Sequence, residues 1–201
     1  QQICYLVFFS KKIYLNLCSW FESGLRYSLG NFQYRNPFHV AIKHQFFDLM
    51  KMILAYSSID VNGLEHLVSS GGISTLGFSI EKKLTPLEIA ILTDNINLVN
   101  FILSIDNIDV NQISYTCNIS GHTNRKDIFS IVLVAALHEN LDILESVLKS
   151  PRIDKNIKSQ STTIRTNSYS CPYNKNESDS DLFKKIKNKN VIQLLKKYNF
   201  I

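Results

Sequence analysis

The chain has 201 residues, a hydrophobic content of 45% and a formal net charge of +5. Its length and hydrophobic content are enough for one or two globular domains. The four cysteines have no CxxC spacing, which argues against a structural zinc site and a dense disulfide framework. Because this cysteine usage is typical of a reducing compartment, we expect an intracellular, cytoplasmic protein.

The chain begins with a segment, residues 3–21, that is rich in Phe, Leu, Tyr and Cys. A transmembrane or signal segment is one interpretation, but Lys11 and Lys12 lie in its middle, and each such charge costs about 2.5–3.5 kcal/mol at the centre of a membrane helix. We therefore expect residues 1–35 to form a partial unit, or cap, of the repeat described next. The apolar character of this end and its start at Gln1 also suggest a piece of a longer or processed protein.

One pattern of 27 residues occurs three times without a gap, at 36–62, 85–111 and 130–156. Each copy holds a small residue, a later leucine and a similar ending, Ile-Asp-Val-Asn or Ile-Asp-Lys-Asn; the small residues and leucines are Ala41, Ala90, Ala135, Leu54, Leu103 and Leu148. Apolar residues at i, i+1, i+4 and i+5 indicate one face of an amphipathic helix. A shorter helix precedes it, beginning most clearly at Thr85-Pro86. The pattern predicts antiparallel helix pairs that approach closely at the alanines.

The openings Asn36-Pro37-Phe38-His39-Val40-Ala41 and Thr85-Pro86-Leu87-Glu88-Ile89-Ala90 resemble the ankyrin-repeat opening Thr-Pro-Leu-His-x-Ala. The Ile-Asp-Val-Asn endings resemble the ankyrin hairpin turn. The third copy departs from this opening, and the usual glycine between the helices is replaced by Gln45, Asp94 and Glu139. The resemblance implies an all-α fold, an ankyrin-repeat solenoid of antiparallel helix pairs with hairpin-like connecting loops. It also implies that His39 makes local hydrogen bonds that hold the repeat turn.

The copies begin 49 and then 45 residues apart, which exceeds the family period of about 33 residues. The surplus lies in two inserts, after Asn62 and after Asn111. These inserts are either recognition loops or tolerated insertions, since doubling the length of a loop costs only about 0.6 kcal/mol. We predict a single domain over 1–201, divided into a cap at 1–35, repeats with inserts at 36–84 and 85–129, a repeat with a long connection at 130–177, and C-terminal capping helices at 178–201.

The last segment accounts for the net positive charge, because six lysines and no acidic residue lie between Leu182 and Ile201. A solvated face of a capping unit explains such a run best. The alternative is a patch for nucleic acid or an anionic membrane. The lysines are Lys184, Lys185, Lys187, Lys189, Lys196 and Lys197.

Motifs for catalysis or cofactor binding are incomplete. No Gly-x-x-x-x-Gly-Lys or Gly-x-Gly-x-x-Gly loop occurs in the sequence. His138-Glu139 begins like a zinc-protease helix, but the second ligand position is Asp142; residues 72–77 approach a nucleophile elbow, but the closing glycine is one residue late. Cys117 and His122 are close in sequence without a third partner. We predict no enzymatic activity, no metal, no cofactor and no small-molecule substrate.

The ankyrin resemblance implies that a concave face, formed by hairpin tips and first helices, binds another protein. We therefore predict a non-catalytic protein-protein interaction scaffold that uses this face and the inter-repeat loops. The alternative is a recruitment arm of a larger enzyme or membrane protein lying outside this chain. The predicted partner-binding residues are Lys43, His44, Glu88, Leu92, Thr93 and His138 from the helices, and Tyr115, His122, Arg125 and Lys126 from the second insert.

Overall fold

The computed structural model describes residues 31–34, 37–55, 60–71, 78–120, 123–154, 156–165 and 173–201. The predicted N-terminal unit falls almost entirely outside these residues. The described residues form helices and strands that alternate along the chain as helix pairs and β-hairpins.

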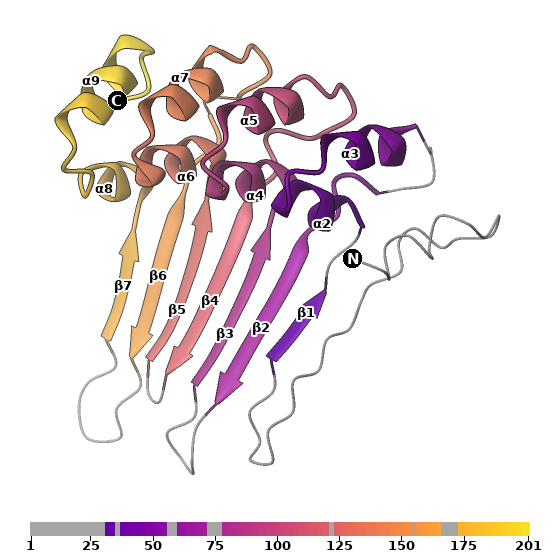
Figure 1. Ribbon diagram of the computed structural model, residues 1–201. Coiled ribbons are helices and arrows are strands. Elements are labelled where there is room, and N and C mark those ends of the chain that lie inside the picture. Colours follow the sequence, from indigo (N-terminus) through magenta and orange to yellow (C-terminus); the bar gives the residue numbers. More distant parts are fainter. Residues whose placement is uncertain are drawn as a thin grey trace.

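The helices of the described residues form four pairs in two rows. The first helices of the pairs, α2, α4, α6 and α8, lie side by side at one end of the strands, and the second helices form another row farther from the strands (Figure 1). The pairs are α2 (Pro37–Lys43) with α3 (Phe47–Leu54), α4 (Pro86–Leu92) with α5 (Ile96–Leu103), α6 (Ile131–His138) with α7 (Leu141–Lys149), and α8 (Asp179–Phe183) with α9 (Lys189–Lys197).

Local signals explain where these helices begin. Thr85 and Ser130 accept hydrogen bonds from backbone N–H groups in the first turns of α4 and α6, so both are N-caps. Asn95, Asn140 and Asn188 cap α5, α7 and α9 in the same way. The amphipathic periodicity and these caps together place the helices where the sequence predicts them.

The connections between the helix pairs are strands, which pair into one antiparallel sheet of seven strands in chain order. The prediction of an all-α ankyrin-repeat solenoid with connecting loops is therefore wrong: the fold is mixed α/β. The strands are β1 (Asn31–Tyr34), β2 (Glu65–Gly71), β3 (Phe78–Leu84), β4 (Ser114–Ser120), β5 (Thr123–Phe129), β6 (Gln160–Arg165) and β7 (Tyr173–Glu177).

Pairing across the sheet explains why the sequence did not reveal these strands. The two inserts and the later connection contain many polar residues and turn signals, which usually indicate loops. Each hairpin, however, also pairs with the hairpin of the next helix pair: Lys82 of β3 faces Leu67 of β2 on one side and Thr116 of β4 on the other. Such cross-strand contacts stabilise a sheet but are not visible within one segment.

The hydrophobic core lies between the helix rows. Ala41, Ala90 and Ala135 are fully buried in α2, α4 and α6, as expected for positions where helices approach closely. Larger side chains fill the space around them, including Leu98 and Ile102 of α5. The apolar faces predicted from periodicity are therefore the faces that pack inward.

The turn between the helices of a pair uses polar residues in place of glycine. Gln45, Asp94 and Glu139 have φ angles of 58°, 56° and 63°, in the left-handed region that favours glycine. Their side chains accept hydrogen bonds from the capping asparagines of the next pair: Asn95 Nδ2 lies 2.7 Å from Gln45 Oε1, and Asn140 Nδ2 lies 2.7 Å from Asp94 Oδ1. Glu139 accepts a longer bond from Asn188. A glycine could not form this link between pairs.

A second set of hydrogen bonds joins the endings that the three copies of the repeat share. Asn62 accepts a hydrogen bond from the backbone N–H of Asp109 at 2.7 Å and donates one to the carbonyl of Asn107 at 2.9 Å. Asn111 makes the same two bonds with Asp154 and Arg152, each at 2.8 Å. Neighbouring helix pairs are thus fixed to each other by side-chain bonds at both ends.

Candidate functional site: the sheet-facing row and the adjoining sheet face

Four residues occupy equivalent positions at the ends of the first helices or, for Lys185, two residues beyond the end of α8. They form what we call the sheet-facing row: Lys43, Leu92, Leu137 and Lys185. The first three follow Ala41, Ala90 and Ala135 by two residues, and Lys185 follows the equivalent Phe183 by two. All four are exposed, with 54% of Leu92 and 48% of Leu137 accessible to solvent. From α2 to α8, the four side chains of the row are therefore basic, apolar, apolar and basic.

The row borders the sheet, as contacts at Lys185 and next to Leu92 show. Lys185 Nζ makes an ion pair with the carboxylate of Glu177 in β7. Glu88, one helical turn before Leu92, forms a hydrogen bond with Ser114 of β4. Residues on this side of the sheet become buried where the strands meet the helices, as Leu84 and Ser114 do at 8% and 5% exposure. We call this side of the sheet its helix-side face.

The register places a polar strip on the helix-side face next to the row. Lys82, Thr116, Asp127, Ser161 and Glu177 follow one another across β3 to β7 as direct cross-strand neighbours. The next strip on the same face, two residues along each strand, consists of Ile80, Asn118, Arg125, Thr163 and Lys175. Charged side chains from both strips therefore share one surface with the row.

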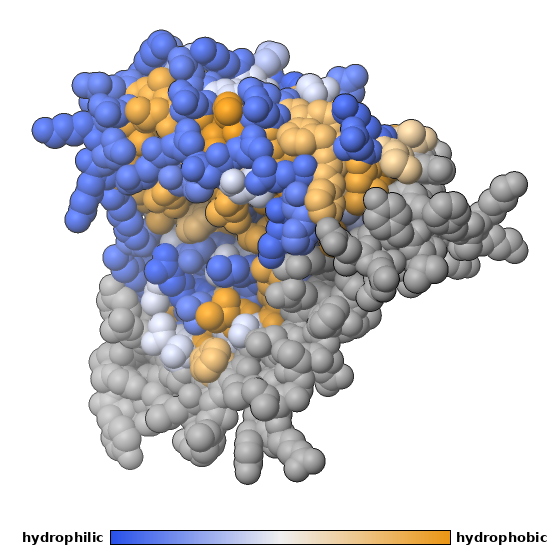
Figure 2. Space-filling view, in the orientation of Figure 1, coloured by the Kyte–Doolittle hydropathy of each residue, from blue (hydrophilic) through white to orange (hydrophobic). Residues whose placement is uncertain are grey.

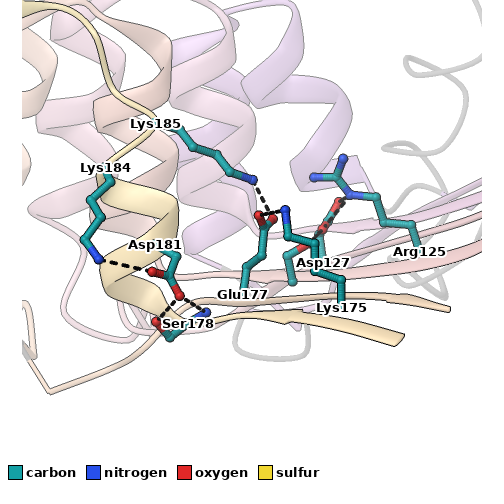
Figure 3. Close-up of polar contacts among 9 residues, drawn as sticks. Arg125, Asp127, Lys175, Glu177, Ser178, Asp181, Lys184 and Lys185 are labelled. Carbon is teal, nitrogen blue, oxygen red and sulfur yellow. Dashed lines mark hydrogen bonds and ion pairs between the residues drawn. The ribbon is translucent and has the colours of Figure 1, made fainter. Parts of the chain in front are cut away.

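At its C-terminal end this surface is a network of paired charges, shown in Figure 3. Arg125 Nε lies 3.0 Å from the Asp127 carboxylate, which also accepts a bond from Ser161 Oγ at 2.5 Å. Lys175 and Lys185 both point at Glu177 in this view, and Lys175 Nζ is 2.6 Å from its carboxylate. These two lysines lower the pKa of Glu177.

The N-terminal cap of α8 adjoins this network. Asp181 accepts hydrogen bonds from the hydroxyl and backbone N–H of Ser178, at 2.7 and 3.2 Å, and lies 3.2 Å from Lys184 Nζ. The bonds from Ser178 and then Lys184 lower the pKa of Asp181 to about 2. The acidic groups at this end are thus ionised and already have basic or hydroxyl partners.

Two basic residues of the same surface, Lys43 and Lys82, are not paired with a described carboxylate in this way. Within the part of the chain that the structure describes, no carboxylate lies within 4.0 Å of the ammonium groups of Lys43 or Lys82. Both side chains are exposed. Among the described residues, neither ammonium group therefore has a paired counter-charge, and the charge of Lys82 acts only more distantly on Glu88.

Glu88 lies beneath the row and is 8% exposed. Its backbone N–H donates to Thr85 Oγ1 at 3.1 Å, so Thr85 caps α4. Burial is the main cause that raises the pKa of Glu88 to about 7, against the opposing effects of Ser114, Thr85 and Lys82. Its Oε2 atom is buried without a hydrogen-bond partner. Glu88 is therefore a destabilising group whenever it is ionised.

The opposite face of the sheet carries a separate cluster around Tyr115. The ammonium groups of Lys83 and Lys126 lie 5.8 and 5.2 Å from the centre of its ring. The hydrogen bond with Cys117 is the largest cause that raises the pKa of Tyr115 to about 12. Because residues along a strand alternate between faces, Lys126 lies here, whereas its neighbour Arg125 lies on the helix-side face.

The residues predicted to bind a partner therefore do not form one site. Lys43, Leu92 and Arg125 lie on the row or the helix-side face, with Glu88 buried beneath, whereas Tyr115 and Lys126 lie on the opposite face. Three of the remaining residues have local contacts: His44 stacks on Phe46, Thr93 Oγ1 donates to Ala90, and His138 Nε2 lies 3.1 Å from Asp94. His122 is outside the described residues.

The sequence prediction missed Leu137, Lys185 and Lys82. The first two stand in the same alignment column as Leu92, so comparison of the copies at that column would have found them. Lys82 could not be found in this way, because its segment was interpreted as a loop. Only the register of β3 shows that it faces the helices.

The nucleophile-elbow segment, residues 72–77, and His122 lie outside the residues that the structure describes. Within the described ranges, no group of three or more His, Cys, Asp or Glu side chains is placed to hold a metal ion. His138 contacts Asp94 rather than the following helix, and Cys117 lies 3.6 Å from Asn124 on the neighbouring strand. Among the same residues, no helix has the length and apolar character needed to cross a membrane.

The surface is also hydrophobic in part. Figure 2 shows hydrophobic patches over the helix rows, separated by hydrophilic side chains.

Comparison of the chain with protein-family models, curated proteins and solved structures finds no significant match. The resemblance to ankyrin repeats thus has no support from family models, and the seven-stranded sheet contradicts it.

Proposed function

We propose that this chain is a non-catalytic protein-binding module that holds a partner protein against the sheet-facing row and the helix-side face. The observation that carries the proposal is the exposure of Leu92 and Leu137, at 54% and 48%, on adjacent helices. Half-burying a leucine against a partner contributes about 1 kcal/mol, because full burial contributes about 1.5–3 kcal/mol. Two such side chains on one rigid surface favour a specific apolar contact.

The bonds between the helix pairs support the same proposal. The links from Gln45 to Asn95 and from Asp94 to Asn140 hold neighbouring first helices in a fixed relation. A surface that is already ordered loses little conformational entropy on binding. The module would serve equally as an independent scaffold or as the recruitment arm of a larger protein, since its own contribution is binding in both cases.

We favour a protein partner over nucleic acid because part of the C-terminal lysine charge is neutralised within the chain. Lys184, Lys185 and Lys197 pair with Asp181, Glu177 and Glu145. The Lys197 pair also raises the pKa of Lys197 and, with Tyr198, lowers that of Glu145. We further propose an intracellular, cytoplasmic location, supported by the spacing of the cysteines and by the free thiol of Cys117.

The test is affinity capture from extracts of the native cell with the full chain and with a Leu92→Asp/Leu137→Asp variant. We expect the variant to lose specific partners, because its aspartates would have to be desolvated in the contact. The matched control is Met52→Asp/Ile201→Asp, which replaces two side chains of similar exposure, 49% and 48%, away from the row. Equal retention of every captured protein by all three chains would reject the proposal.

A further inference from the structure

The charge pattern of the row identifies the chemistry of the partner. We propose that the row and the strip beside it bind a segment of another protein in which acidic side chains flank apolar ones. The inference rests on the proposed function and adds the sign and spacing of the recognised groups. The apolar side chains of the segment contact Leu92 and Leu137, and its carboxylates meet Lys43 and Lys82.

The first step of the argument is the excess of positive charge on this surface. The row and the charged residues of the two strips comprise four lysines and one arginine, against two carboxylates, Asp127 and Glu177. Those carboxylates are occupied by Arg125, Lys175 and Lys185. Glu88 is only about half ionised at pH 7, because burial raises its pKa to about 7, so the excess of positive charge remains.

The second step is the order of the groups. Lys43 stands beside Leu92 in the row because α2 packs against α4, and Lys82 approaches the same helix from β3, where its charge acts on Glu88. Positive charge therefore lies on two sides of the exposed leucine. A purely apolar segment leaves both lysines without a counter-charge, whereas a basic segment is repelled by them.

The third step is the length of the segment that is needed to cross the row. Adjacent packed helices lie about 8–10 Å apart, so the row from α2 to α8 spans roughly 24–30 Å. An extended chain advances about 3.3 Å per residue, so a segment of about eight residues crosses it. Such a segment lies across the helices and ends near Lys185, whose pairing with Glu177 leaves a net positive group together with Lys175.

The experiment is selection from a displayed library of random peptides of about nine residues, with the full chain as bait. We expect the enriched peptides to carry more acidic than basic residues together with at least a pair of apolar residues. The tightest peptide should bind Lys43→Glu/Lys82→Glu about tenfold more weakly at low salt, since each exposed charge pair changes from attraction to repulsion. Added salt should reduce that difference.

The control Lys187→Glu/Lys189→Glu changes the net charge by the same amount on exposed lysines outside the row, and it should bind the peptide as the unmodified chain does. If circular dichroism shows that the double variant is poorly folded, Lys43→Glu alone replaces it in the test. This single variant should bind the peptide about threefold more weakly. Equal weakening by the control and the row variant would overturn the inference.

The outcomes separate this inference from the proposed function. Enrichment of apolar peptides without acidic residues would overturn the charge pattern and leave protein binding in place. No enrichment by the full chain would count against both. Tighter binding of a single-stranded oligonucleotide than of any peptide, lost in Lys43→Glu/Lys82→Glu, would assign the surface to nucleic acid instead.

Discussion

Replacement of Glu88 by glutamine should remove a large part of the pH dependence of folding stability. Burial raises the pKa of Glu88 from 4.5 to about 7, so the folded state binds a proton that the unfolded state releases between these values. The free energy of unfolding must then fall as pH rises from the unfolded pKa through the folded one. Because one pKa unit corresponds to 1.36 kcal/mol, the complete loss is about 3 kcal/mol.

The assay is urea unfolding of the full chain and of Glu88→Gln at about pH 5 and about pH 8.5, between which the loss from this group is roughly 2.5 kcal/mol. Glutamine keeps the shape of the side chain and an oxygen for the bonds from Ser114 and Thr85, but it cannot ionise. The unmodified chain should therefore lose more stability between the two conditions than the variant, by roughly that amount. At the higher pH the variant should be the more stable protein.

The control is Asp106→Asn, which removes one negative charge from an exposed position. It should follow the pH profile of the unmodified chain, since an exposed carboxylate remains hydrated in both states. Parallel profiles for the unmodified chain and Glu88→Gln would refute the reasoning. They would mean that Glu88 does not gain a proton on folding, and so that its buried Oε2 atom has a partner or water that stabilises its charge.

Two further predictions concern the bonds and packing between helix pairs. Ala90→Leu should lower the free energy of unfolding by about 1–3 kcal/mol, because the buried site would be overpacked. Ala55→Leu, at an exposed site, should change it little. Equal effects of the two substitutions in thermal unfolding would contradict the close packing at Ala90. Asn62→Ala removes two hydrogen bonds to the next unit, which should cost roughly 1–3 kcal/mol in urea unfolding. The exposed Asn190 provides the control substitution, and a loss no greater than that of Asn190→Ala would show that the Asn62 bonds do not fix the units.

The helices were predictable because their signals are local. The pairs that begin with α4, α6 and α8 have caps such as Thr85, and apolar residues recur at helical spacing, so a window of one unit contains the necessary information. The strands were not predictable in this way, since their stability comes from pairing with segments of other units. Lys82, for example, lies between Leu67 and Thr116, which come from different inserts.

The candidate site shows the same division. Lys43 and Leu92 follow from the helix pattern alone, whereas the proximity of Lys82 to Glu88 and of Lys185 to Glu177 depends on the register of the sheet. The polar turn residues are an intermediate case. Asp94 looks like a poor substitute for glycine until Asn140, the cap of α7 in the next pair, is seen to donate to it.

The order of strands in the sheet follows the order of the chain, and this has a consequence for synthesis on the ribosome. Each hairpin pairs first with itself and then with the hairpin made just before it, so every new strand finds its neighbour already present. The edge to which the next hairpin adds is first β3 and then β5. The last edge is the short strand β7, where Lys175 hinders pairing with another chain.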